Sequence, residues 1–395
     1  MSETRATNPF KKFFALESAG GIVLFLVAVL ALLCANSPLA EAYHAFVHFP
    51  LGISLGGIGF SAPLELWIND GLMAIFFLLV GMEIKRELLE GELSSLGQAV
   101  LPFFAAVGGV ALPAVIYVCF NWEHPENMRG WAIPTATDIA FSIGVLALFG
   151  SRLSLGLKVF LTAVAVIDDL IAIVVIAVFY TSEISEQNLL MAALCLLALA
   201  VFNRRKVNLY WPYLLVGALM WYFTLKSGIH ATIAGVMLGA MMPLKLERHG
   251  SGSMLKYLEH LLQPWVVFFI MPIFAFANAG INFEGITLAS LADPVPAGIA
   301  VGLFAGKQIG IFTTALILIK LGIARLPEGA TWAQFYLVCM IAGIGFTMSL
   351  FVGGLAFQDA QHATSIRLGV MLGSLASAIV GGALLHFTLR KPKTL

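Results

Sequence analysis

The segment from Lys158 to Tyr180 is apolar throughout, except for two adjacent carboxylates, Asp168 and Asp169, near its centre. As a helix rising 1.5 Å per residue it measures about 35 Å, enough to cross a bilayer core of roughly 30 Å. A charge at the bilayer centre costs roughly 3 kcal/mol on insertion scales, so these carboxylates need water, a partner or an ion beside them. Successive helix residues point about 100° apart, so the two side chains cannot face the same direction.

Similar apolar stretches recur along the whole chain, which is 60% hydrophobic and only 11% charged. Soluble domains are nearer to about 25% charged, so the composition indicates an all-α polytopic membrane protein. The net charge is zero and there is no basic tract, which argues against nucleic-acid binding. Hydrophobic runs predict twelve spans, at about 13–35, 64–83, 97–120, 130–149, 158–180, 188–202, 208–224, 229–244, 258–278, 296–319, 333–357 and 364–388.

Lysine and arginine decide the orientation of these spans. With the amino terminus inside, 18 of the 22 basic residues fall at inner span ends, three fall at outer ends, and Lys307 lies within a span. This bias predicts an even number of spans with both termini in the cytoplasm. The basic residues before the first run resemble a signal peptide, but the run is long and we expect an uncleaved first helix.

Short features outside the spans are also informative. Residues 51–60 alternate apolar with small or polar residues around Gly56-Gly57, which favours a β-hairpin on the outer face over a plain loop. An isolated hairpin is only marginally stable, so we expect it to pair with something. The four cysteines lie in or beside apolar runs without a CxxC motif and are predicted to be reduced packing residues.

Two spans carry interruptions. In the fourth, Pro134 removes a helix hydrogen bond just before Thr135, Thr137 and Asp138, and the apolar part that follows is too short to cross alone. The eleventh contains Gly343-Ile-Gly-Phe-Thr347 halfway along. We interpret both as broken helices, the alternative being kinked but continuous ones. Spans three to five and ten to twelve, about residues 97–180 and 296–388, would then be inverted repeats within one transmembrane domain.

Four ionisable residues are therefore expected near mid-bilayer depth: Asp138, Asp168, Asp169 and Lys307. Three carboxylates and one ammonium do not balance, and both burial and like charge favour protonated carboxyls. The remaining acidic capacity is met either by protons or by a cation, and these exclude each other. Hard oxygen ligands suit Na⁺ or Li⁺, and nothing here offers sulfur or imidazole to a transition metal. The alternative for the acids is a structural, hydrogen-bonded role.

Five motifs now point to a known family. They are Thr135-Ala-Thr-Asp-Ile-Ala-Phe141, Val166-Ile-Asp-Asp-Leu170, Leu225-Lys-Ser-Gly-Ile-His-Ala-Thr232, Phe274-Ala-Phe-Ala-Asn-Ala-Gly280 and Gly343-Ile-Gly-Phe-Thr-Met-Ser349. Together they resemble bacterial NhaA-type sodium/proton antiporters along nearly the whole chain. Inverted repeats and broken helices are already described for that family itself.

The resemblance implies a twelve-helix fold in which the broken spans cross, and a homodimer joined by the hairpin, about residues 49–62. It also implies electrogenic export of Na⁺ or Li⁺ for more than one imported proton, serving pH homeostasis and salt tolerance at the bacterial inner membrane, with no cofactor. Asp169 is implied as the main Na⁺ ligand and Asp168 as its neighbour in ion binding, paired with Lys307 when the cation is absent. Asp138, with Thr137, would compensate the helix ends at the crossing.

The same resemblance assigns a pH response to His230, Glu83, Arg86 and Glu259. From the residues alone, Glu83 and Arg86 belong either to a solvated helix end or to a regulatory cluster, and His230 is equally a packing residue. Gln263 departs from the family pattern, in which we expect a histidine, so it receives no pH-sensing role.

The sequence thus predicts a transporter and no enzyme. Two other functions remain as alternatives: a sodium-coupled solute symporter of similar fold, and more remotely an intramembrane aspartyl protease. The protease needs two carboxylates facing each other from different helices, often in a GxGD context, whereas Val166-Ile167 precede the sequential pair here. The symporter needs additional polar groups around a substrate, and few are present.

Overall fold

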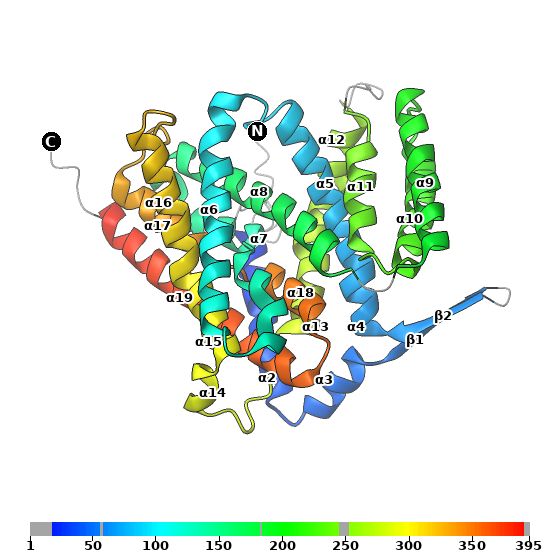
Figure 1. The fold of residues 1–395 in the computed structure, drawn as a ribbon, viewed down its shortest axis with the longest axis horizontal. Helices are drawn as coiled ribbons and strands as arrows, with labels where there is room; N and C mark the ends of the chain where they lie inside the picture. The colour runs from blue at the N-terminus through cyan, green and yellow to red at the C-terminus, as the bar shows by residue number, and fades with distance from the viewer. Residues whose placement is uncertain (1–17, 56–57, 182–183, 245–252, 391–395) are drawn as a thin grey trace, which may run out of the picture.

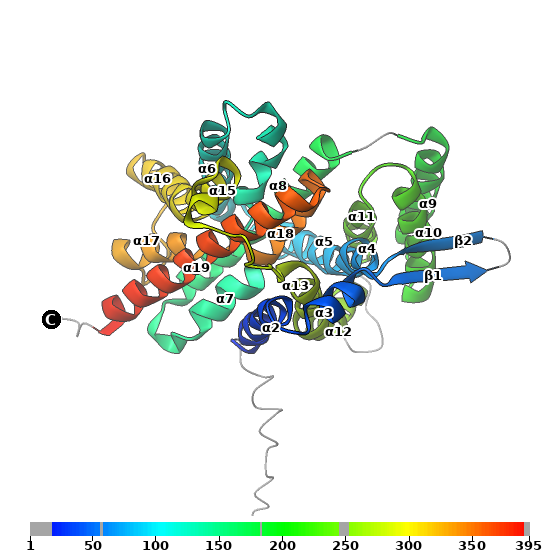
Figure 2. The same ribbon diagram turned by 90° about the horizontal axis from the view of Figure 1, so that it is seen from below.

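The computed structural model describes residues 18–55, 58–181, 184–244 and 253–390. Nearly all of its regular structure is helical, and a single two-stranded sheet projects from one side of the described chain (Figures 1 and 2). The predicted start of the first span and the turn at Gly56-Gly57 lie outside the described residues.

The first half of the chain contains the hairpin and the first broken span. Its elements are α2 (Ala19–Ala35), α3 (Ala40–Val47), β1 (Pro50–Leu55), β2 (Ile58–Pro63), α4 (Leu64–Leu66), η1 (Trp67–Leu72), α5 (Met73–Leu89), α6 (Leu96–Phe120), η2 (Pro125–Thr135), α7 (Ile139–Ala147), η3 (Gly150–Arg152), α8 (Leu155–Phe179) and α9 (Glu186–Arg204).

The second half contains the other broken span and a long last helix. Its elements are α10 (Tyr210–Lys226), α11 (Thr232–Met241), α12 (Met254–Trp265), η4 (Val266–Ile270), α13 (Met271–Ala279), α14 (Leu288–Ala292), α15 (Pro294–Val301), η5 (Gly302–Gly306), α16 (Lys307–Lys320), α17 (Trp332–Ile341), α18 (Phe346–Ala356) and α19 (Ala360–Arg390).

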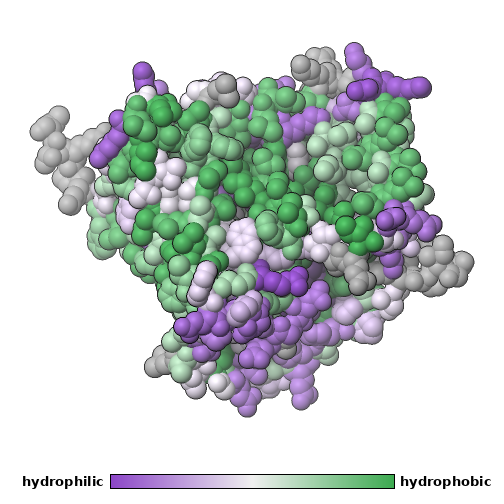
Figure 3. Space-filling model, viewed as in Figure 1, coloured by the Kyte–Doolittle hydropathy of each residue, from purple (hydrophilic) through white to green (hydrophobic). Residues whose placement is uncertain are grey.

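The protein is a multi-pass membrane protein. Within the described chain, seven helices are long and apolar enough to cross a membrane, and the number rises to ten if each of three bent helix pairs is one span. Figure 3 shows hydrophobic side chains over the middle of one face, with hydrophilic ones gathered at its lower end. All four cysteines are free thiols, as the sequence predicts.

The predicted hairpin is present. Strands β1 and β2 pair antiparallel from Pro50 opposite Pro63 to Leu55 opposite Ile58. Beside its base, the indole of Trp67 donates to the Leu51 carbonyl at 3.0 Å. The hairpin extends away from the helices, past the ends of α9 and α10 (Figure 1).

Both predicted interruptions are present as well. Helices η2 and α7 meet at 41° and helices α17 and α18 at 42°, each across a break of a few residues. The breaks lie against each other, because the amide of Asp138 donates to the Ile344 carbonyl at 2.7 Å. A Cβ atom on Gly345 would lie only 2.9 Å from the Ala136 carbonyl oxygen, so the crossing needs glycine there.

Three π-helical segments, η1, η4 and η5, interrupt three other spans. Such π-helical bulges are rare in proteins as a whole, but those that occur are often at functional sites. The hydrophobic pattern of a sequence does not reveal them. Segment η1 contains Asp70, and η5 leads directly into Lys307. They therefore set the angular position of two charged side chains within otherwise regular spans.

Helices α5 and α11 pack closely at glycine. An ideal Cβ on Gly235 would lie 2.1 Å from the Ala74 carbonyl oxygen. We expect Gly235→Ala to destabilise the protein by about 1–3 kcal/mol, because the backbone of α5 must move. Gly354→Ala in α18 is the matched control, since no described atom lies within 4 Å of that Cβ. Thermal unfolding in detergent measures both, and equal melting temperatures would contradict this packing argument.

Candidate functional site

A buried ion pair joins two spans at the centre of the molecule. The Lys307 ammonium at the start of α16 lies 2.6 Å from Oδ2 of Asp168 in α8, and the exposed fractions of the two side chains are 0% and 1%. The ammonium also donates to the carbonyl of Thr135, the last residue of η2. A cation is favourable at this helix C-terminus, so Lys307 neutralises both a carboxylate and a helix end.

Thr137 links this pair to the second broken span. Its hydroxyl lies 2.7 Å from Oδ2 of Asp168 and 3.0 Å from the carbonyl of Ala342, where α17 ends. Thr137 is itself fully buried. The extended residues between η2 and α7 thus place a hydroxyl where two spans and a carboxylate meet.

Asp138 caps two helices at once. Its Oδ1 accepts from the backbone amide of Phe141 in α7 at 2.9 Å, and its Oδ2 accepts from the amide of Thr347 in α18 at 3.1 Å. The Thr347 hydroxyl also donates to Oδ2. A negative charge is stabilising at a helix N-terminus, and here one carboxylate serves the N-termini of both α7 and α18.

Asp169 differs from its neighbour. Its side chain is 1% exposed, yet neither carboxylate oxygen has a hydrogen-bond partner within the described chain. Oδ1 of Asp168 likewise lacks a partner there. A buried carboxylate without a partner is strongly unfavourable as an anion, so these oxygens need a proton or a cation.

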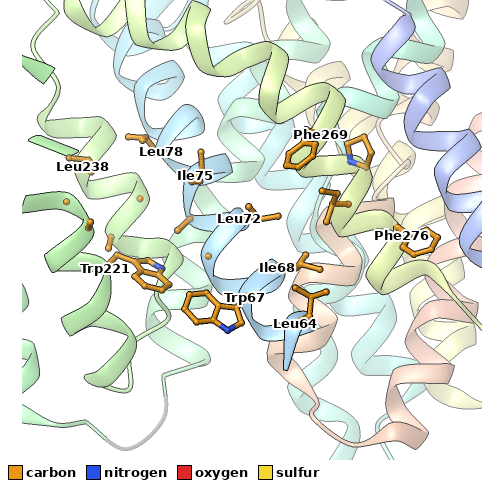
Figure 4. A pocket seen from close by; sticks show the side chains of 18 of the residues that line it. Leu64, Trp67, Ile68, Leu72, Ile75, Leu78, Trp221, Leu238, Phe269 and Phe276 are labelled. Carbon is orange, nitrogen blue, oxygen red and sulfur yellow. The ribbon is translucent and has the colours of Figure 1, made fainter. Parts of the chain in front are cut away.

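The acidic cluster is separate from the large cavity. That cavity, of about 860 Å³, lies between η1, α5, α10, α11, η4 and α13 and is lined by apolar side chains such as Leu72, Ile75 and Phe269 (Figure 4). None of the predicted site residues lines it. In the described part of the chain no three His, Cys, Asp or Glu side chains converge on a metal position.

The four residues expected to respond to pH fall in two places. Arg86 of α5 donates through Nε to both oxygens of Glu259 in α12, at 3.0 and 3.1 Å, and Glu83 lies one turn away on α5. His230 precedes α11, with Nε2 3.1 Å from Oδ1 of Asp70 and Nδ1 2.8 Å from the Thr232 hydroxyl. Gln263 is exposed near the end of α12, and no contact described for the chain joins it to either group.

Sequence reasoning missed three contributors. Asp70 pairs with His230, and the signal was an acid inside the apolar start of a span. Thr347 donates to Asp138 and belongs to the motif at 343–349, in which we gave this threonine no role of its own. The Thr135 carbonyl accepts from Lys307, and a backbone acceptor leaves no trace in residue type.

Known proteins resemble the chain along almost its full length. The family model described as Na⁺/H⁺ antiporter 1 matches residues 11–385. The Na⁺/H⁺ antiporter NhaA 2 of Saccharophagus degradans is 53% identical over 371 residues, which cover 93% of this chain and 97% of that protein. The NhaA proteins of Caulobacter vibrioides and Serratia proteamaculans are 51% and 50% identical, covering 99% and 97% of this chain and 94% and 99% of their own lengths. These relatives are transporters and not enzymes, as the sequence predicts, and the chain belongs to the Na⁺/H⁺ antiporter 1 family.

Proposed function

We propose that this protein is an electrogenic antiporter that exports Na⁺ or Li⁺ in exchange for more than one imported proton. One observation carries the proposal: Asp169 is fully buried without a described partner, beside an Asp168 that is already paired with Lys307. Family membership supports the two ions, because the relatives are named as Na⁺/H⁺ antiporters.

The coupling follows from competition at these oxygens. A proton on Asp169 removes the charge that a cation needs, and a bound cation removes the need for the proton. Cation binding also draws the free oxygen of Asp168 into coordination and weakens its bond to Lys307. Two carboxylates that exchange protons for one Na⁺ move up to two protons per cation, which makes the exchange electrogenic. No cofactor is required.

The remaining parts of the proposal concern architecture. Adding α10 and α11 to the seven long helices and three bent pairs gives twelve spans. Spans three to five and ten to twelve then form two inverted repeats, at about 97–180 and 296–388, whose broken helices meet at Asp138. The distribution of lysine and arginine supports cytoplasmic termini, and the exposed hairpin supports a homodimer at the bacterial inner membrane.

Regulation by pH is assigned to the two groups that contain the predicted residues. The cluster of Glu83, Arg86 and Glu259 joins α5 to α12 at the cytoplasmic end in the proposed orientation. The pair of His230 and Asp70 joins the segment before α11 to η1 at the other end. The first of these groups lies on α5, which packs against α8.

Fluorescence quenching of a pH dye in inverted vesicles tests the function. We expect NaCl and LiCl to release protons from vesicles acidified by respiration at several pH values, and KCl to have little effect. No organic solute is present apart from the respiratory substrate and the dye, so a symporter for any other solute gives no response. Vesicles without the protein are the control, and equal responses to all three salts would contradict the proposal.

A further inference from the structure

At the end of the molecule that carries the hairpin, a chain of side-chain amides has only one possible orientation. The amide nitrogen of Asn121 lies 3.0 Å from the Tyr117 carbonyl and 3.1 Å from the Pro294 carbonyl, so it must donate to both. The Asn121 oxygen therefore accepts, and it takes the amide nitrogen of Asn127 at 3.0 Å. This leaves the Asn127 oxygen facing Nε2 of His362 at 3.1 Å, so Nε2 must carry a proton.

The other ring nitrogen faces a carboxylate. Nδ1 of His362 lies 2.8 and 2.7 Å from the two oxygens of Asp359. Asp359 caps α19, and the donated backbone amide of His362 lowers the pKa of this carboxyl, so it is ionised at neutral pH. Nδ1 must then also donate, and both contacts are satisfied only by the doubly protonated, cationic imidazolium. The ring stacks on Phe357 at 4.3 Å, a face that accepts a cation.

Of the other charged groups near His362, some favour its cationic form and others disfavour it. His124, just before η2, and Glu126, in the first turn of η2, form an exposed pair at 3.4 Å, and the negative charge of Glu126 favours a cation on His362. On α19, Arg367 donates to the Gly280 carbonyl and disfavours that cation, as does the positive end of α19 itself. Asp359 is the group in direct contact, so it dominates.

We propose that His362 is a positioning residue that clamps the start of η2 to the start of α19 while it is protonated and releases η2 when it loses a proton. A neutral ring has one N–H, and the charged Asp359 carboxylate is a stronger acceptor than the Asn127 amide oxygen, so the Asn127 oxygen then faces a lone pair. The released end matters because the far end of η2 supplies the Thr135 carbonyl to Lys307. In the orientation proposed above, the clamp responds to pH outside the cell.

Hydrogen exchange of the η2 amides in nanodiscs tests the clamp without transport. After correction for the intrinsic effect of pH on exchange, we expect wild-type protection over 125–135 to fall about tenfold from acid to alkaline pH, as a hydrogen bond to a charged group is lost. His362→Ala removes both contacts and gives low protection at every pH. His124→Ala is the matched control and behaves as wild type.

Asp359→Asn separates the clamp from mere packing. Asparagine still caps α19, and its amide donates to Nδ1, so a neutral ring with a proton on Nε2 satisfies both neighbours. We therefore expect high protection at every pH, the opposite of His362→Ala. Wild-type pH dependence in either variant overturns the clamp.

The effect on exchange depends on the proposed antiport and is measured separately. In proteoliposomes with fixed internal pH, we expect Na⁺-driven proton flux to depend less on external pH in Asp359→Asn and in His362→Ala than in wild type, because the clamp stays closed in the first variant and open in the second. Profiles identical to wild type in both variants overturn the positioning role. If wild type itself shows no Na⁺-driven flux, the antiport proposal fails, and amide exchange still decides the clamp.

Discussion

Replacing Asp169 by asparagine is expected to abolish Na⁺-driven proton movement. The variant keeps the size of the side chain but holds no proton that it can exchange and no charge for a cation. Because neither oxygen of Asp169 has a described protein partner, the substitution breaks no structural hydrogen bond. Activity should therefore fall to the background of empty vesicles while the protein remains folded. Dye quenching in inverted vesicles measures the first, and thermal unfolding in detergent measures the second.

A second measurement separates ion binding from transport. We expect Na⁺ to raise the melting temperature of wild type, because a ligand that binds only the folded state stabilises it, and to leave Asp169→Asn unchanged. Asp293, before α15, carries an exposed carboxylate, and Asp293→Asn is the control. It should retain both the Na⁺-driven proton movement and the rise in melting temperature with Na⁺. Exchange at wild-type rates in Asp169→Asn would rule out the proposed role, whatever the melting temperatures show.

The burial and the diverging directions of the central acids could be predicted from sequence because they follow from the apolar run and from helix geometry. Asp168 and Asp169 lie in the middle of an uninterrupted apolar run, and adjacent helix positions must diverge. The structure places Asp168 against Lys307 and leaves Asp169 without a described partner. The interruptions at Pro134 and Gly343 were equally visible, since proline removes a helix hydrogen bond and glycine is a poor helix former.

Contacts between spans could not be predicted in the same way. Nothing in the residues around Asp138 says that its second oxygen caps α18, because Thr347 lies more than two hundred residues away. The π-helical segment before Lys307 shifts that side chain around its helix, and no hydrophobic pattern encodes the shift. Likewise, the grouping of His230 with Asp70 depends on how α5 packs against α11.

Replacing Lys307 by methionine is expected to destabilise the protein by about 3–5 kcal/mol at neutral pH. Methionine fills similar volume, so the loss comes from leaving the Asp168 carboxylate buried without its cation. The destabilisation should shrink in acid, where Asp168 becomes protonated and no longer needs a partner. Melting temperature across the pH range measures this, with Lys320→Met at the exposed end of the same helix as the control. A melting profile identical to wild type would contradict the pairing.

The double variant Lys307→Met with Asp168→Asn decides whether the loss belongs to the pair. Each single change leaves one buried charge uncompensated, whereas the double change leaves none. We therefore expect the double variant to be more stable than either single variant, although the Thr135 carbonyl still loses its donor. Additive losses would instead mean that each residue stabilises the fold independently, because double-mutant cycles report the coupling between two side chains. Coupling of this kind would show that the 2.6 Å contact holds α8 to α16, and hence that a cation able to compete for Asp168 can loosen those two spans.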